Sequence, residues 1–149
     1  MDWDFAFRIA NYWAMAFWVV LAFLPRKPLT MSFIMYGGIA VLALSYVLLL
    51  ASLWSGRMDP GGAVAQVDFA RLSGIMGMFA TKGWMVLGWV HYLCFDLFVG
   101  LWIARDADGK GIGRIWQVPI LLATFMFGPV GLLLWLIARE PAARRTART

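Results

Sequence analysis

The chain has 149 residues, of which 62% are hydrophobic and only 14% are charged, and its formal net charge is +5. An average soluble domain is about 45–50% apolar and about 25% charged, so this composition excludes an ordinary soluble fold and a disordered chain. The basic residues lie in short loops and at the C-terminal end, which argues against a nucleic-acid-binding protein. The length and composition together predict one domain embedded in a membrane.

Charged residues divide the chain into four apolar stretches, at about 5–24, 29–54, 83–104 and 115–138. Each is close to the roughly 20 residues that an α-helix needs to cross a bilayer, and lipid forces such a segment to satisfy its own backbone hydrogen bonds. The predicted fold class is therefore all-α. We expect an integral membrane four-helix bundle that forms a single transmembrane domain over residues 1–139, followed by a basic tail at 140–149.

A further helix is expected between the second and third spans, at about 63–80. Apolar residues recur there at helical spacing, while Asp68 and Arg71 stand three residues apart on the polar side. This pattern is typical of an amphipathic helix that lies in the membrane interface.

The distribution of Lys and Arg predicts the orientation. Four spans would place both termini and the segment between spans two and three on one side of the membrane. That side would hold eight of the 13 basic residues and the opposite side five. Because positive charge is enriched on the cytoplasmic side, both termini are expected in the cytoplasm.

The third span contains the acidic residue Asp96 and the only histidine of the chain, His91. A carboxyl group near the middle of a span costs roughly 2.5–3.5 kcal/mol on insertion scales, so it is a candidate functional residue. The two side chains offer an acid and a base for catalysis. Five helical residues separate them by about 140° around the axis and roughly 7.5 Å along it, so they cannot bond to each other directly. The alternative is structural, with both side chains hydrogen-bonded inside the bundle.

Depth in the membrane suggests residues that would contact a substrate. At about 1.5 Å per residue, Asp96 is expected level with Thr124 of the fourth span, and His91 level with Asn11 and Gly128. Pro129 lacks a backbone N–H and is expected to bend the fourth span. The residues predicted to bind substrate on these grounds, or because they share a helix face with Asp96, are Asn11, Trp89, Tyr92, Thr124, Gly128 and Pro129.

No metal or other cofactor is expected. The segment from Asp106 to Gln117 begins like a calcium-binding loop, but its fifth residue is Lys110, and Gln117 stands where a bidentate glutamate belongs. With Cys94 as its single cysteine, the chain cannot form an internal disulfide or a cysteine metal cluster.

Two segments carry a resemblance to a known family. The run WVHYLCFDLFVG at 89–100, followed by TFMFGPVG at 124–131, resembles the abscisic-acid-deficient-four family, whose plant members are associated with neoxanthin synthesis. The close match covers about 84–139, and the first two spans agree only in hydropathy. The resemblance implies a small multi-pass membrane protein linked to conversion of the epoxycarotenoid violaxanthin into the allenic carotenoid neoxanthin. The N-terminus is unlike a transit peptide, so a bacterial homologue in a cytoplasmic membrane is expected.

Three functions follow as hypotheses. The first is a cofactor-independent, neoxanthin synthase-like isomerase of an epoxycarotenoid or related isoprenoid, with Asp96 as acid and His91 as base. The second is a non-catalytic membrane subunit that binds pigment or lipid. A proton-coupled carrier is less favoured, because four short helices leave little room for alternating access. The expected partners are membrane lipid, an apolar carotenoid or isoprenoid ligand, and either a second copy of the chain or a partner membrane enzyme.

Overall fold

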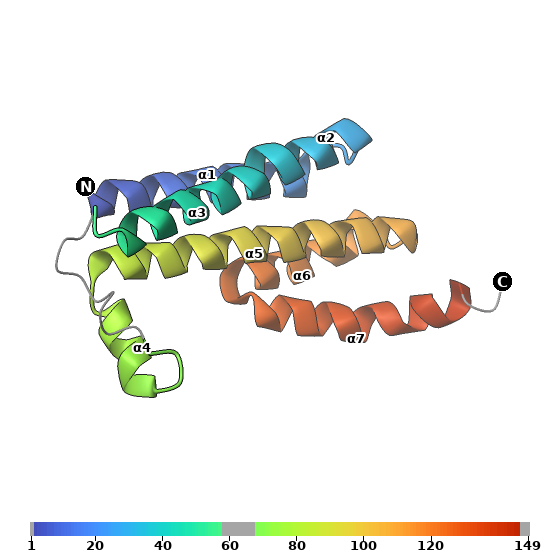
Figure 1. The fold of residues 1–149 in the computed structure, drawn as a ribbon. Helices are drawn as coiled ribbons and strands as arrows, with labels where there is room; N and C mark the ends of the chain where they lie inside the picture. The colour runs from blue at the N-terminus through green and yellow to red at the C-terminus, as the bar shows by residue number, and fades with distance from the viewer. Residues whose placement is uncertain (1, 58–67, 147–149) are drawn as a thin grey trace.

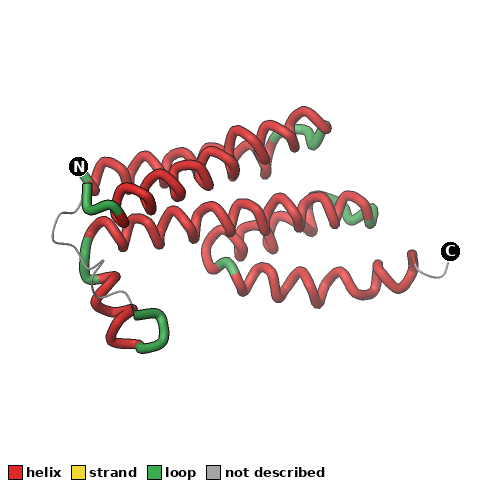
Figure 2. Tube along the Cα trace, viewed as in Figure 1, coloured by secondary structure: helices red, strands yellow, loops and turns green. Residues whose placement is uncertain are grey.

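The computed structural model describes residues 2–57 and 68–146, and all regular secondary structure within these ranges is helical (Figure 2). Three helices are long and apolar enough to cross a membrane. They are α1 (Trp3–Phe23), the continuous helix Pro28–Trp54, and α5 (Lys82–Gly109). The first three predicted spans therefore correspond to real helices.

The boundaries of the first two helices follow from local residue chemistry. The carboxyl group of Asp2 accepts a hydrogen bond of 3.0 Å from the backbone N–H of Phe5 and so caps the start of α1. After α1, Pro28 stands at the first position of the next helix, where a missing N–H costs nothing. The short loop between them turns the chain back, so the two helices lie side by side (Figure 1).

The second membrane-length helix is not uniform. It begins as α2 (Pro28–Phe33), widens into the π-helical segment η1 (Ile34–Ile39) and continues as α3 (Ala40–Trp54). In the widened segment the carbonyl oxygen of Gly37 accepts a hydrogen bond of 3.1 Å from the indole N–H of Trp13. A Cβ on Gly38 would lie 2.8 Å from the ring of Phe17, so the missing side chain lets α1 approach closely.

The long helix α5 is the centre of the molecule. In its most apolar stretch, 56% of the residues are buried inside the protein. The corresponding share is 28% for α1 and 22% for Pro28–Trp54. It packs against α1, α3 and α6 (Figure 1). Many side chains of the larger buried apolar cluster therefore come from α5. The same helix carries both His91 and Asp96.

The prediction of a continuous fourth span is wrong. Helix α6 (Arg114–Phe127) ends at Gly128, and α7 (Pro129–Thr146) runs back alongside it as an antiparallel hairpin (Figure 1). Gly128 has a φ of 43°, a conformation that residues with a side chain rarely adopt, and Pro129 has no N–H with which to continue α6. The expected bend at Pro129 is thus a complete reversal of the chain.

With this hairpin in place of a fourth span, the four-helix bundle is not confirmed, and the described N-terminal and C-terminal helices end far from each other. Lys82, at the start of α5, forms an ion pair of 3.1 Å with Asp4, whereas Asp106, near the end of α5, forms an ion pair of 2.9 Å with Arg139 of α7. Asp4 of α1 and Arg139 of α7 therefore lie at opposite ends of α5 (Figure 1). If α5 crosses a membrane, Asp4 and Arg139 lie near opposite sides of it, which differs from the expectation that both termini share one side.

The interfacial helix is shorter than predicted. Helix α4 covers Leu72–Phe79, and residues 68–71 form a turn in which the Asp68 carboxylate accepts a hydrogen bond from the backbone N–H of Ala70. The predicted start at residue 63 lies outside the described residues. An aspartate that bonds to a backbone N–H two residues ahead favours a turn over a helix, which explains the later start.

Candidate functional site

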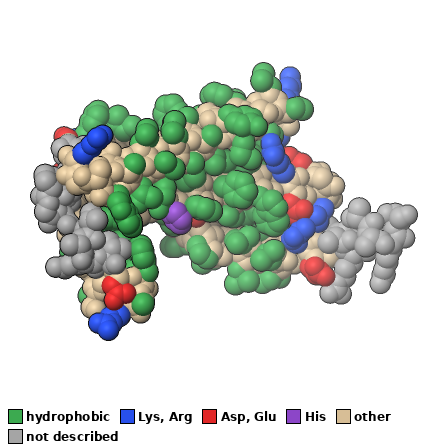
Figure 3. Space-filling view, in the orientation of Figure 1, with side chains coloured by type: hydrophobic (Ala, Val, Ile, Leu, Met, Phe, Trp, Pro, Cys, Tyr) green, Lys and Arg blue, Asp and Glu red, His purple; other side chains and the backbone are tan. Residues whose placement is uncertain are grey.

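His91 and Asp96 lie on α5 in different surroundings. The His91 side chain is exposed and stands between two aromatic rings, with ring centroids 5.7 Å from Tyr46 and 4.6 Å from Phe95. In Figure 3 the chain's only histidine, in purple, lies at the surface among apolar side chains. Asp96 is only 8% exposed. The predicted acid is therefore enclosed in the protein, whereas the predicted base is open to the surface.

Asp96 faces the tip of the α6–α7 hairpin. A Cβ on Gly128 would lie 2.6 Å from its Oδ1 atom, so only glycine leaves room for the carboxyl group there. The Tyr92 side chain, one turn earlier on α5, is close enough to interact with the same carboxyl group. The Oδ2 atom is buried and has no hydrogen-bond partner within the described part of the chain. A buried polar oxygen without a partner is costly and is often kept for function.

Three of the predicted substrate-binding residues form a connected row. The Trp89 indole N–H donates a hydrogen bond of 3.1 Å to the Asn11 side chain, and the Trp89 ring stacks on Tyr92 at 5.1 Å. Through Tyr92 this row reaches Asp96. Asn11 also donates to the carbonyl oxygen of Phe7 at 2.7 Å. Asn11 is expected level with His91, and one of its two hydrogen-bond partners is Trp89, two residues before His91 on α5.

The remaining predicted residues belong to the hairpin. Thr124 is fully buried, and its hydroxyl donates a hydrogen bond of 2.9 Å to the carbonyl oxygen of Ile120. Thr124 packs against Gly131, where any side chain would collide with it. Pro129 begins α7 beside the reversal at Gly128. Thr124, Gly128 and Pro129 shape the hairpin. Of these residues, Gly128 is the one that lies directly beside the Asp96 carboxyl group.

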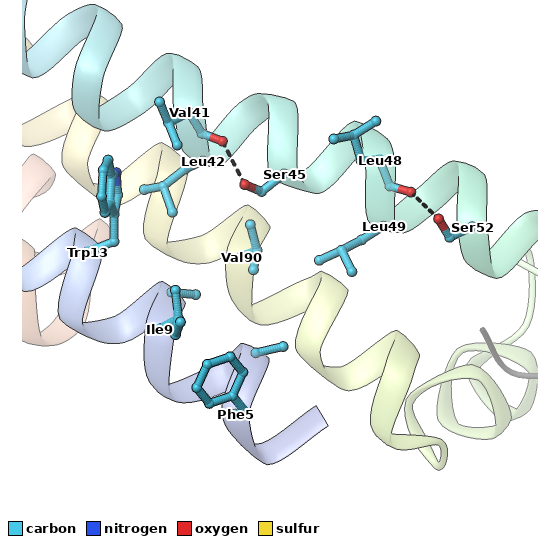
Figure 4. Close-up of a pocket in the computed structure, with 12 residues that line it drawn as sticks. Phe5, Ile9, Trp13, Val41, Leu42, Ser45, Leu48, Leu49, Ser52 and Val90 are labelled. Carbon is cyan, nitrogen blue, oxygen red and sulfur yellow. Dashed lines mark hydrogen bonds between the residues drawn. The ribbon is translucent and has the colours of Figure 1, made fainter. Parts of the chain in front are cut away.

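An apolar groove between two of the membrane-length helices contains none of the predicted residues. It has a volume of about 500 Å³ and lies between α1 and α3, with Val90 of α5 at its floor (Figure 4). Ser45 and Ser52 point toward it, but their hydroxyls bond to their own helix, at 2.8 Å to Val41 and 2.7 Å to Leu48. A signal for this groove was present in the sequence, because Ala6 and Ala10 on one helix and the two serines on the other leave space where larger residues would fill it.

Two smaller grooves flank helix α4. One, of about 380 Å³, is lined by His91, Tyr46 and Trp84, and the other, of about 370 Å³, by Trp89 and Tyr92. Both are lined by Phe79 and Gly88. A Cβ on Gly88 would lie 2.6 Å from the Phe79 ring, so this ring packs directly on α5 between His91 on one side and Tyr92 on the other.

Metal ligands are not clustered in this region. Residues 2–57 and 68–146 contain no group of three or more His, Cys, Asp or Glu side chains that could hold a metal ion. The titratable side chains described above for this region are the imidazole of His91, the buried carboxyl group of Asp96 and the phenol of Tyr92.

Comparison with known protein families shows the family to which the chain belongs. The sequence model of the ABA DEFICIENT 4-like family matches residues 5–135, which is most of the chain. The chain belongs to this family. The match extends over α1 and α3 as well as over the predicted motifs, so the relationship is wider than the close resemblance at 84–139. No curated protein and no solved structure matches the chain. The ABA DEFICIENT 4-like match thus includes both the α1–α3 groove and the row that leads to Asp96.

Proposed function

We propose that this ABA DEFICIENT 4-like protein acts in carotenoid or related isoprenoid metabolism in a membrane, by binding a long apolar polyene in the groove between α1 and α3. The observation that carries the proposal is the groove itself, about 500 Å³ in volume and lined by apolar side chains and two serines whose hydroxyls are already bonded. Apolar grooves of this size are typical of sites for small apolar ligands.

The position of the groove supports entry from lipid. Its walls include side chains that are exposed on the outer faces of the spans, such as Phe5, Ile9 and Leu48. A polyene dissolved in the bilayer would reach them without crossing the core. The stiff rod of a polyene also suits a groove between two side-by-side helices, because little conformational freedom is lost on binding.

Isomerisation of an epoxycarotenoid is the second candidate, and the unpartnered Oδ2 atom of Asp96 favours it. In such a reaction an acid gives a proton to the epoxide oxygen as the C–O bond breaks, and a base removes a vinylic proton. A hydroxyl group and an allene form, and the product is an isomer of the substrate. His91, which lines a groove, would be the base. Asp96 would act through Tyr92, which lines the adjoining groove. Binding is better supported, because the acid and the base do not line one cavity.

Pigment analysis tests both functions. The chain would be expressed in a carotenoid-producing host together with Ser45→Phe, which fills the groove, and Ala43→Phe, which adds the same ring at an exposed position of α3. Binding predicts pigment that purifies with the wild type and with Ala43→Phe but not with Ser45→Phe.

Catalysis predicts a changed pigment profile in the host, abolished by His91→Ala and by Asp96→Asn. Pigment binding without such a change would leave binding as the function. An unchanged profile together with pigment-free protein would contradict both functions.

A further inference from the structure

A polar cavity of about 340 Å³ lies at the opposite end of α5 from Asp4 and Lys82. It is formed by the loop after α1, by α2 and by the last turns of α5. The residues that line it are Arg26, Pro28, Met31, Ser32, Arg105 and Asp108. None of them lines the three apolar grooves described above. The cavity is thus a separate feature, at the level where the spans end.

Arg26 is the buried cation of this cavity, with a side chain only 6% exposed. One of its terminal nitrogens donates to Asp108 at 2.9 Å and also to the Gln117 side chain. Its Nε atom is buried and has no hydrogen-bond partner among the described residues. Burial lowers the pKa of the Arg26 guanidinium, Asp108 raises it, and the nearby Arg114 lowers it again. One terminal nitrogen of Arg26 is thus paired with Asp108 and also bonded to the carbonyl oxygen of Ala104 at 3.3 Å, whereas the Nε atom is left free to donate to a ligand.

Positive charge exceeds negative charge around the cavity. Three guanidinium groups, those of Arg26, Arg105 and Arg114, stand against the single lining carboxylate of Asp108. The neighbouring carboxylate of Asp106 does not correct this excess, because it is held by Lys110 at 2.6 Å and by Arg139 at 3.1 Å. Arg105 is exposed and forms no ion pair with the described part of the chain. The cavity favours an anion.

The surface beside the cavity is apolar. Leu29 and Phe33 of α2, which flank the lining residue Ser32, are 81% and 55% exposed. A ligand that matched both the positive charge of the cavity and the apolar surface of α2 would have an anionic head at the end of the spans and an apolar chain along α2.

We propose that this cavity binds the phosphate group of an anionic phospholipid, with Arg26, Arg105 and Ser32 around the phosphate and an acyl chain along Leu29 and Phe33. Arginine is well suited to this role, because its planar group donates paired, charge-assisted hydrogen bonds to phosphate oxygens. Anionic lipid is also the phosphate source that the membrane surface presents to basic side chains at the ends of spans.

The test uses the full chain purified in detergent, with thermal unfolding and native mass spectrometry as readouts. The probes are phosphatidylglycerol, phosphatidylcholine and inorganic phosphate. We expect saturable binding and stabilisation by phosphatidylglycerol only. Because Arg105 is exposed and bears on no core packing, Arg105→Gln is expected to fold and to weaken binding at least roughly tenfold, the usual effect of losing one charged hydrogen bond. The control Arg8→Gln removes an exposed arginine at the other end of the molecule and should leave binding unchanged.

Three results would overturn the proposal. Equal stabilisation by phosphatidylcholine would show that the negative headgroup charge is not recognised. Equal losses in Arg105→Gln and Arg8→Gln would show general attraction to the cationic protein. Stabilisation by inorganic phosphate alone, with the same dependence on Arg105, would assign the cavity to a free anion instead of a lipid.

Discussion

Arg139 of α7 and Asp106 of α5 form an ion pair in which the closest nitrogen and oxygen atoms are 2.9 Å apart. The chain enters α6 at this same end of α5, where Arg114 donates a hydrogen bond to the carbonyl oxygen of Leu24. Helix α6 therefore begins, and α7 reaches Asp106, at the same end of the molecule, and in a membrane this path would make a re-entrant hairpin. A hairpin of this kind is tolerated at membrane depth where its tip is buried against protein, and here the tip packs on Asp96.

The first prediction concerns topology. With the hairpin, six basic residues whose side chains are described lie at the end of the molecule that holds the loop after α1, and four lie at the other end, in contrast to the distribution expected for four spans. The six are Arg26, Lys27, Arg105, Lys110, Arg114 and Arg139, and the four are Arg8, Arg57, Arg71 and Lys82. The positive-inside rule then predicts a cytoplasmic C-terminal end and an N-terminus on the opposite side.

Thiol labelling measures this topology. Cys94 is buried and is replaced by serine, and single cysteines are then introduced as Asp2→Cys or Glu140→Cys. A membrane-impermeant reagent should label the Asp2→Cys protein in intact cells and the Glu140→Cys protein only after permeabilisation. Labelling of both from the same side would restore the continuous fourth span.

The second prediction concerns the tip of the hairpin. Gly128→Ala should destabilise the protein by about 3 kcal/mol, because the residue has a φ of 43° and its Cβ would lie 2.6 Å from an oxygen of Asp96. Gly77→Ala is the matched control, since a Cβ there meets nothing within 4 Å. Thermal unfolding in detergent compares the two variants. Equal stability of both would mean that the reversal at Gly128 does not form.

The third prediction compares two acidic residues. Asp106 accepts hydrogen bonds from Lys110, Arg139 and the buried Trp135, so Asp106→Asn should cost about 2–3 kcal/mol of stability. Asp4 pairs with Lys82 where both side chains are mostly exposed, so Asp4→Asn should cost less than about 1 kcal/mol. Chemical denaturation in detergent provides the measurement, and a larger loss for Asp4→Asn would contradict the network around Asp106.

The fourth prediction separates a structural from a chemical role of Asp96. Asp96→Asn should change stability by less than about 1 kcal/mol, because the amide has the same shape and the Oδ2 atom has no hydrogen bond to lose within the described chain. If isomerisation is the function, the same variant abolishes pigment conversion. A loss of several kcal/mol in thermal unfolding, with no change in pigments, would instead make Asp96 a residue that holds the bundle to the hairpin.

Hydropathy and charge predicted the first three membrane-length helices correctly, because the burial of apolar residues in lipid is a local property that each segment carries by itself. The sequence also indicates a bend at Pro129, whereas it assigns Gly128 only to substrate binding. Their combined effect was underestimated. A bend and a reversal need the same two residues, and the choice between them depends on Thr124 packing against Gly131 and on Arg139 reaching Asp106.

The low charge content of the chain was enough to place it in a membrane and to single out Asp96 and His91 on one helix. Only the tertiary structure decided that the two side chains open onto different surroundings, that the C-terminal helix returns to the end from which it came, and that Arg26 lies buried with an excess of positive charge around it. The physical reason is that a helix period fixes the direction of each side chain around its own axis, whereas cavities, ion pairs and charge balance depend on which helices become neighbours.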